Sequence, residues 1–94
     1  MTEIKIVEPY TFRGFYIPPR MHAGLDRWIN NGIYPGDFLT AVIENNLKEA
    51  VSHADDENIR NLPAYSGYLY NEAPMGCYGS KEIAQRWHES FKED

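Results

Sequence analysis

The chain has 94 residues, a length typical of one domain, and its hydrophobic content of 43 % and charged content of 24 % are those of a globular protein rather than a disordered one. The net charge of −5 argues against duplex DNA and anionic membranes as partners, because phosphate neutralisation needs clustered Lys and Arg. The single cysteine, Cys77, excludes an internal disulfide and fits a reducing compartment. Since no apolar run approaches the roughly 20 residues of a membrane span and no signal peptide opens the chain, we expect a cytoplasmic protein.

Residues 1–17 are predicted to form an N-terminal arm, and residues 18–94 a helical domain. Ile4 and Ile6 alternate with charged residues at the period of a strand, and residues 11–17 are rich in β-formers interrupted by Gly14. We expect an extended arm or a short hairpin packed on the helical body. A strand that pairs with a second copy of the chain is the alternative.

The first predicted helix runs from about Pro19 to Asn31. A proline suits the first helical turn, and Gly32 is a typical C-terminal stop. One apolar face is predicted from residues at helical spacing: Met21, Leu25, Trp28 and Ile29.

The second predicted helix runs from about Pro35 to Ala54 as one continuous element. Asp37 lies in its first turn, where an acid favours the helix dipole. Its apolar stripe is predicted from seven residues at helical spacing: Leu39, Val42, Ile43, Leu47, Ala50, Val51 and Ala54. Leu47 lies in the middle of this stripe, so we expect it to be buried and expect Leu47→Asp to unfold the domain.

The third predicted helix runs from about Asp56 to Glu72, with Asp55 or Asp56 as its N-cap and a kink or break at Pro63. A fourth follows the cap Ser80 and carries four apolar residues on one face: Ile83, Ala84, Trp87 and Phe91. The predicted fold class is therefore all-α: a small irregular bundle of about four helices with an extended or short β N-terminal arm.

The stretch from Ile17 to Trp87 resembles a family of small proteins encoded by bacteriophages and prophages. The motifs that carry the resemblance are Pro35–Val42, Asn45–Leu47 with Ala50, Ala54–Asp55 with Asn58, Tyr70–Pro74 and Gly76–Ser80. The family has Trp where this chain has Tyr78, and Pro63 also departs from its pattern. The resemblance implies a phage or prophage source, and hence the host cell cytoplasm, but brings no known activity.

The loop before the fourth helix is a candidate ligand site. Gly79 and Ser80 precede a helix start, where free amides and the helix dipole commonly hold phosphate. Tyr70 and Tyr78 are candidates to stack on a base, and Asn71 offers a hydrogen-bonding edge. The alternative is that Tyr70 belongs to the core, Asn71 caps the third helix and the loop is only a turn.

Arg20, Arg27 and Trp28 are further candidates on the first helix. The two arginines are seven residues apart and share one face, and a cation pair beside an indole suits a phosphorylated nucleotide or an acidic protein patch. The alternative is that surface arginines cover a core tryptophan.

Catalytic and metal hypotheses have less support from the sequence. No spacing places a histidine beside Cys77, as a thiol nucleophile would require, and a lone cysteine is usually structural. His53, Asp55 and Asp56 match no familiar metal-ligand motif, and two acids before a helix usually cap it. We therefore expect no enzyme activity, no metal and no cofactor.

The sequence favours a non-catalytic, homo-oligomeric binding protein. One hypothesis is that it sequesters a phosphorylated nucleotide signal of bacterial immunity and so acts against host defence. Its alternative is a protein-interaction module that inhibits or redirects a host protein. The expected ligand-binding residues are Arg20, Arg27, Trp28, Tyr70, Asn71, Tyr78, Gly79 and Ser80.

Overall fold

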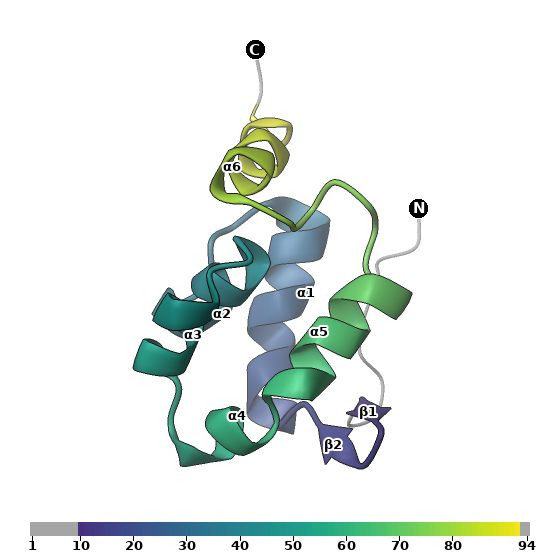
Figure 1. Cartoon of the computed structure of the whole chain (residues 1–94). Helices are drawn as coiled ribbons and strands as arrows, with labels where there is room; N and C mark the ends of the chain where they lie inside the picture. Colours follow the sequence, from purple (N-terminus) through teal and green to yellow (C-terminus); the bar gives the residue numbers. More distant parts are fainter. Residues whose placement is uncertain (1–9, 93–94) are drawn as a thin grey trace.

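The computed structural model describes residues 10–92, which form six α-helices, one 3-10 turn and a two-stranded hairpin. α1 (His22–Asn31) runs through the middle of the molecule, with α2 (Asp37–Ile43) and α3 (Leu47–His53) on one side and α5 (Leu62–Asn71) on the other (Figure 1). α4 (Asp56–Arg60) connects the two sides, and α6 (Lys81–Glu89) crosses the far end of α1. The predicted helical class with a small N-terminal β element is confirmed.

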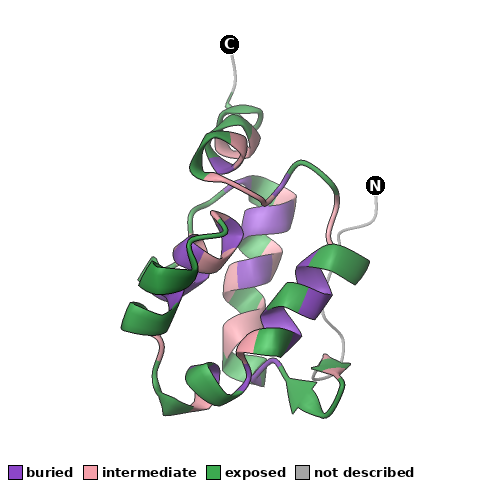
Figure 2. Cartoon of the chain, viewed as in Figure 1, coloured by how far each residue is buried: buried purple, intermediate pink, exposed green. Residues whose placement is uncertain are grey.

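α1 ends at Asn31 as predicted, but it starts at His22, three residues after the predicted start at Pro19. A 3-10 turn, Pro19–Met21, leads into it, and Gly32 stops it in the left-handed conformation with a φ of 67°. Leu25, Trp28 and Ile29 are buried at helical spacing, so α1 is the helix around which the core is built (Figure 2).

The continuous helix predicted over residues 35–54 is wrong, because the chain breaks between α2 and α3. Asn45 takes a left-handed φ of 59°, and the Asn46 amide donates back to the Ala41 carbonyl at 2.8 Å, a typical way to end a helix. The Asn46 side chain then accepts from the Glu49 amide and caps α3. Two adjacent asparagines thus end one helix and start the next.

Because of this break, the apolar stripe predicted over residues 39–54 is buried only in part. Ile43 and Ala50 are buried, but Leu47 is 67 % exposed and Val51 is also exposed. The change in direction after Asn45 rotates the apolar face of α3, so the part of the stripe beyond residue 46 no longer points uniformly into the core.

The predicted interruption near Pro63 is confirmed as a full break. Asp55 caps α4 by accepting from the Asn58 amide, and Asn61 separates α4 from α5. Pro63 lies in the first turn of α5, where a missing amide costs nothing. Since the helices predicted over 35–54 and 56–72 each split in two, the bundle has six helices in its described part rather than about four.

The hairpin consists of β1 (Thr11–Phe12) and β2 (Phe15–Tyr16), paired antiparallel with Phe12 opposite Phe15. Arg13 and Gly14 both take positive φ, the geometry of a two-residue hairpin turn. The hairpin packs on α5 and is held by the Tyr16 amide, which donates to the buried Asn61 side chain at 2.9 Å. The strand pattern of Ile4 and Ile6 lies outside the described residues.

Candidate functional site

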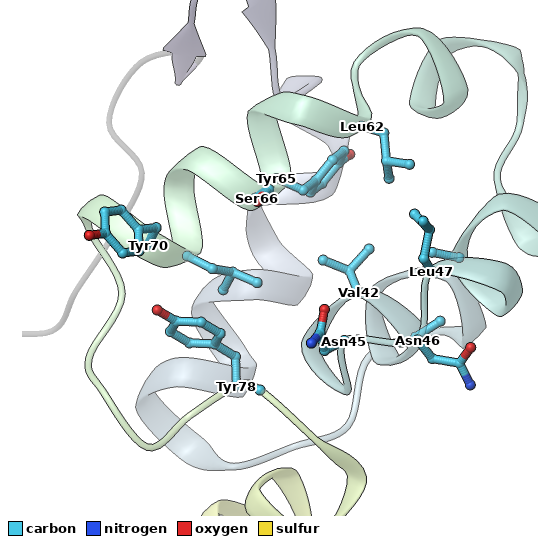
Figure 3. A pocket seen from close by; sticks show the side chains of 13 residues that line it. Val42, Asn45, Asn46, Leu47, Leu62, Tyr65, Ser66, Tyr70 and Tyr78 are labelled. Carbon is cyan, nitrogen blue, oxygen red and sulfur yellow. The ribbon is translucent and has the colours of Figure 1, made fainter.

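A pocket of about 320 Å³ lies between α2–α3 and α5 and is closed at one end by the loop before α6 (Figure 3). Val42, Asn45 and Leu47 approach it from one side, while Tyr65 and other side chains of α5 approach from the other. Its volume is at the lower end of the range found for small-ligand sites.

The floor of the pocket is apolar and buried, whereas its exposed rim combines apolar side chains with polar ones. Ala41, Ala50 and Leu69 are buried lining residues, and all three also belong to the hydrophobic core. At the rim, Leu47 and Tyr70 are 67 % and 81 % exposed. Large exposed side chains such as Leu47 and Tyr70 beside an apolar floor, with polar groups around them, are typical of a surface that becomes covered by a partner.

The polar groups that line the pocket are uncharged. They belong to Asn45, Asn46, Ser66 and three tyrosines, and no Asp, Glu, Lys, Arg or His lines the pocket within residues 10–92. The Tyr65 hydroxyl donates to the buried Asn58 side chain at 2.6 Å, and Asn46 caps α3, so some of this polarity serves the fold. The pocket therefore suits an apolar or aromatic group with a few hydrogen bonds.

Three of the eight residues expected from the sequence meet at this pocket: Tyr70, Tyr78 and Gly79. Tyr70 comes from the end of α5 and Tyr78 from the loop before α6 (Figure 3). The alternative that Tyr70 is a core residue is wrong, because its side chain is almost fully exposed. Asn71 is exposed at the last position of α5 and lies outside the set of lining residues.

Trp28 is not available as a stacking platform. Its side chain is completely buried, its Nε1–H donates to the Cys77 carbonyl at 2.8 Å, and its ring lies 4.8 Å from that of Tyr34. Every face of the indole is occupied by the protein itself. The alternative for Trp28, a core tryptophan, is the one that the structure supports.

The two arginines of the expected site do not converge on the pocket. The Arg20 guanidinium lies 2.8 Å from the Asp55 carboxylate and 3.2 Å from that of Glu57. The pKa of the Glu57 carboxyl is lowered by hydrogen bonds from the Tyr16 hydroxyl and from Arg20. Arg27 is exposed on α1 and does not line the pocket.

The predicted phosphate cradle before α6 is engaged in structural hydrogen bonds. The Gly79 amide donates to the Ile43 carbonyl at 2.9 Å, and the Ser80 hydroxyl accepts from the Ile83 amide at 3.1 Å. Ser80 is thus the N-cap that the sequence predicted. Because Gly79 uses its amide to tie the loop to α2, the loop shapes the pocket instead of presenting donors for an anion.

Cys77 is buried, and the residues considered as metal ligands are engaged in contacts that stabilise the fold. Burial raises the pKa of the Cys77 thiol to about 11, so the nucleophilic thiolate is scarce at neutral pH. His53 lies 3.3 Å from Glu49, and Asp55 caps α4 while it pairs with Arg20. Among the residues that the structure describes, no three such side chains group as a metal site.

The sequence did not predict the lining residues that lie on and between α2 and α3 or in the first half of α5. These are Ala41, Val42, Asn45, Asn46, Leu47, Ala50, Leu62, Tyr65 and Ser66. One sequence signal was present: adjacent asparagines inside a predicted helix favour caps and turns, and Asn tolerates positive φ. With a break there, Leu47 is a candidate surface residue.

Within residues 10–92, none of the helices combines the length and the apolar character that a bilayer-spanning helix needs. Comparison of the chain with family models, with curated proteins and with solved structures gave no match.

Proposed function

We propose that this chain is a non-catalytic protein-interaction module that holds an apolar or aromatic group of its partner in the pocket between α2–α3 and α5. The observation that carries the proposal is the uncharged pocket with a buried apolar floor and with Leu47 and Tyr70 exposed at its rim. Covering such side chains yields roughly 25 cal/mol per Å² of apolar surface removed from water. Anchors that fill a pocket of this kind commonly dominate the binding energy of an interface.

The resemblance of the sequence to phage proteins suggests the setting of this function. The partner that we propose is a protein of the bacterial host, which the module would inhibit or redirect. In that setting the protein acts in the host cytoplasm.

A phosphorylated nucleotide is the second candidate ligand, and one observation favours it: Tyr70 and Tyr78 line the same pocket, where their rings could stack on a base. It is ranked second because no cation lines that pocket within the described residues, and because the Gly79 amide is bonded to Ile43. A bound nucleotide would have to leave its phosphates in solvent.

The test for a protein partner uses light-induced crosslinking in infected cells. Ser66, which is exposed and lines the pocket, is replaced by the photoreactive residue benzoylphenylalanine. The control places the same residue at Ile33, which is exposed outside the pocket. We expect a defined protein adduct from position 66 that is absent from position 33. Identical adducts from both positions, or none, would count against the pocket as a protein-binding site.

Calorimetry separates the second candidate from the first. Cyclic and ADP-ribose-type nucleotides are titrated into the wild type and into Tyr70→Ala, Tyr78→Ala and Arg27→Ala. Stacking worth roughly 1–3 kcal/mol per base predicts about ten- to hundredfold weaker binding for the two tyrosine variants and no change for Arg27→Ala. If no nucleotide binds the wild type below millimolar concentration, the nucleotide hypothesis fails and the interaction module stands.

A further inference from the structure

We call the part of the pocket between α3 (Leu47 and Ala50) and α5 (Leu62, Ser66 and Leu69) the groove. Resting on the proposed interaction function, we propose that its occupant is an amphipathic helix of a basic partner protein. The groove is walled by helices, whose backbone amides and carbonyls are paired within the helices themselves. An extended peptide laid there would find no strand edge to pair with, so its own backbone groups would lose water without a replacement. A helix avoids this cost, because its backbone amides and carbonyls are already paired with one another.

The positions of the apolar side chains fit a helix. Leu47 and Ala50 are three residues apart on α3, so they lie on one face of that helix; both line the pocket, and Leu47 is exposed. On the opposite wall, Leu62, Ser66 and Leu69 recur at helical spacing along α5 and line the pocket. A ten-residue helix such as α5 is about 15 Å long, which matches two to three turns of a bound helix and about three apolar anchors.

None of the residues that line the pocket is charged, but the segments that contain them are acidic, which favours a basic partner. The two segments that contribute the lining residues, 41–50 and 62–79, contain Glu44, Glu49 and Glu72 but only one cation, Lys48. The whole chain carries a net charge of −5. Complementary charge speeds encounter and disfavours partners of like charge, so the bound helix should carry Lys or Arg beside its apolar stripe.

The experiment measures fluorescence anisotropy with three labelled synthetic peptides, each about five helical turns long. The first has Leu at helical spacing and Lys elsewhere. The second has the same Leu positions with Glu in place of Lys, and the third is the Lys peptide with a central proline that breaks the helix. Each is titrated into the full wild-type chain and into Leu47→Ser, Ser66→Arg and the matched surface control Ile33→Ser, after circular dichroism has shown that every variant is folded.

We expect the Lys peptide to bind at least about tenfold more tightly than the Glu peptide at low salt, and the difference to shrink as salt is added. Leu47→Ser and Ser66→Arg should each weaken the Lys peptide about tenfold or more, since one removes an apolar contact and the other places a bulky cation on the groove wall. Ile33→Ser should leave binding unchanged.

Three results would overturn the helix assignment. They are equal binding of the Glu peptide, equal binding of the proline-broken peptide, and insensitivity of binding to Leu47→Ser and Ser66→Arg. A dimer of this chain that Leu47→Ser dissociates would also overturn it, because the occupant would then be a second copy. The proposed function is judged separately by the crosslink from position 66: an adduct there together with a failed peptide series refutes the helix and leaves the interaction module standing.

Discussion

Trp28 shows how one side chain joins distant parts of this chain. Its indole Nε1–H donates to the Cys77 carbonyl in the loop before α6, and its own carbonyl accepts from the Trp87 indole at 2.9 Å. The ring itself is completely buried. A buried donor that lost its acceptor would cost about 1–3 kcal/mol, so Trp28 fixes where the loop and α6 sit relative to α1.

The first prediction compares the effect on stability of the same substitution at Ile43 and at Leu47, two residues of the apolar stripe predicted over residues 39–54. Ile43 is completely buried, so Ile43→Asp places an unpaired carboxylate in the core and should cost several kcal/mol, enough to unfold a domain whose stability is roughly 5–10 kcal/mol. Leu47→Asp, at a position 67 % exposed, should change stability by no more than about 0.5 kcal/mol. Urea denaturation of both variants provides the measurement. If Leu47→Asp is unfolded, Leu47 is buried after all, and the prediction of one continuous helix over residues 35–54 is correct.

At the scale of elements, short helices are held in place by a few specific contacts. α6 docks on the end of α1 through Trp87 and through His88, whose Nδ1–H donates to the Gly32 carbonyl at 2.7 Å. The hairpin docks on α5 because Gly67 leaves room for the ring of Phe12. Each of these contacts lies between residues far apart in the sequence, so the elements depend on one another for stability.

The second prediction tests the docking of the hairpin on α5. A Cβ at Gly67 would lie 2.5 Å from the Phe12 ring, so Gly67→Ala should destabilise by about 1–3 kcal/mol although Ala favours helices by about 1 kcal/mol. With Phe12→Ala already present, the same change should be neutral or stabilising. The double-mutant cycle is measured by chemical denaturation, with Ser66→Ala on the exposed side of α5 as the control. Additive effects of the two changes would disprove the contact.

At the scale of the whole molecule, the core is thin and much apolar surface remains exposed. Besides the groove, Phe15, Ile33, Met75 and Phe91 are exposed on the hairpin, the α1–α2 loop, the loop before α6 and the end of α6. A chain of 94 residues cannot hide thirteen aromatic rings and its aliphatic side chains in one core.

The third prediction is that the protein forms homo-oligomers through surfaces outside the groove. Association would cover exposed apolar side chains and add stability that a small domain lacks. Sedimentation velocity at high micromolar concentration should show a species larger than the monomer, and Leu47→Ser should not change it. A monomer at that concentration would refute the prediction.

The fourth prediction concerns alkaline pH. Burial raises the pKa of Cys77 to about 11 and that of Tyr68 to about 12, and it raises the pKa of Tyr65 further. Below about pH 8 these groups are protonated in the folded and unfolded states alike, so they do not make stability depend on pH. Above that pH the unfolded chain releases the protons first, and folding stability should fall by on the order of 5 kcal/mol by pH 11.

The measurement is the urea midpoint between pH 8 and pH 11, together with tyrosinate absorbance in native and unfolded protein. Cys77→Ala should flatten the first part of the decline, between about pH 8 and pH 10, since it removes the group with the lowest pKa of the three. A midpoint that stays constant up to pH 11 would contradict the prediction.

The sequence by itself determined the helical class and the ends of helices that depend on local chemistry. Gly32 stops α1, Asp55 caps α4 and Ser80 caps α6 because each acts on backbone groups within a few residues. Tyr70 and Tyr78 are close in the sequence and flank one loop, so the sequence predicts that they belong to one site. Both line the same pocket.

Tertiary structure alone decided which side chains face that pocket. Helical periodicity could not show that the chain turns at Asn45, so Leu47 was expected inside and lies outside. It also could not show that Arg20 pairs with Asp55, that Trp28 is enclosed or that the Gly79 amide is bonded to Ile43. The contacts of Arg20, Trp28 and Gly79 are made with partners 35 or more residues away in the chain, and a local pattern carries no information about contacts at that separation.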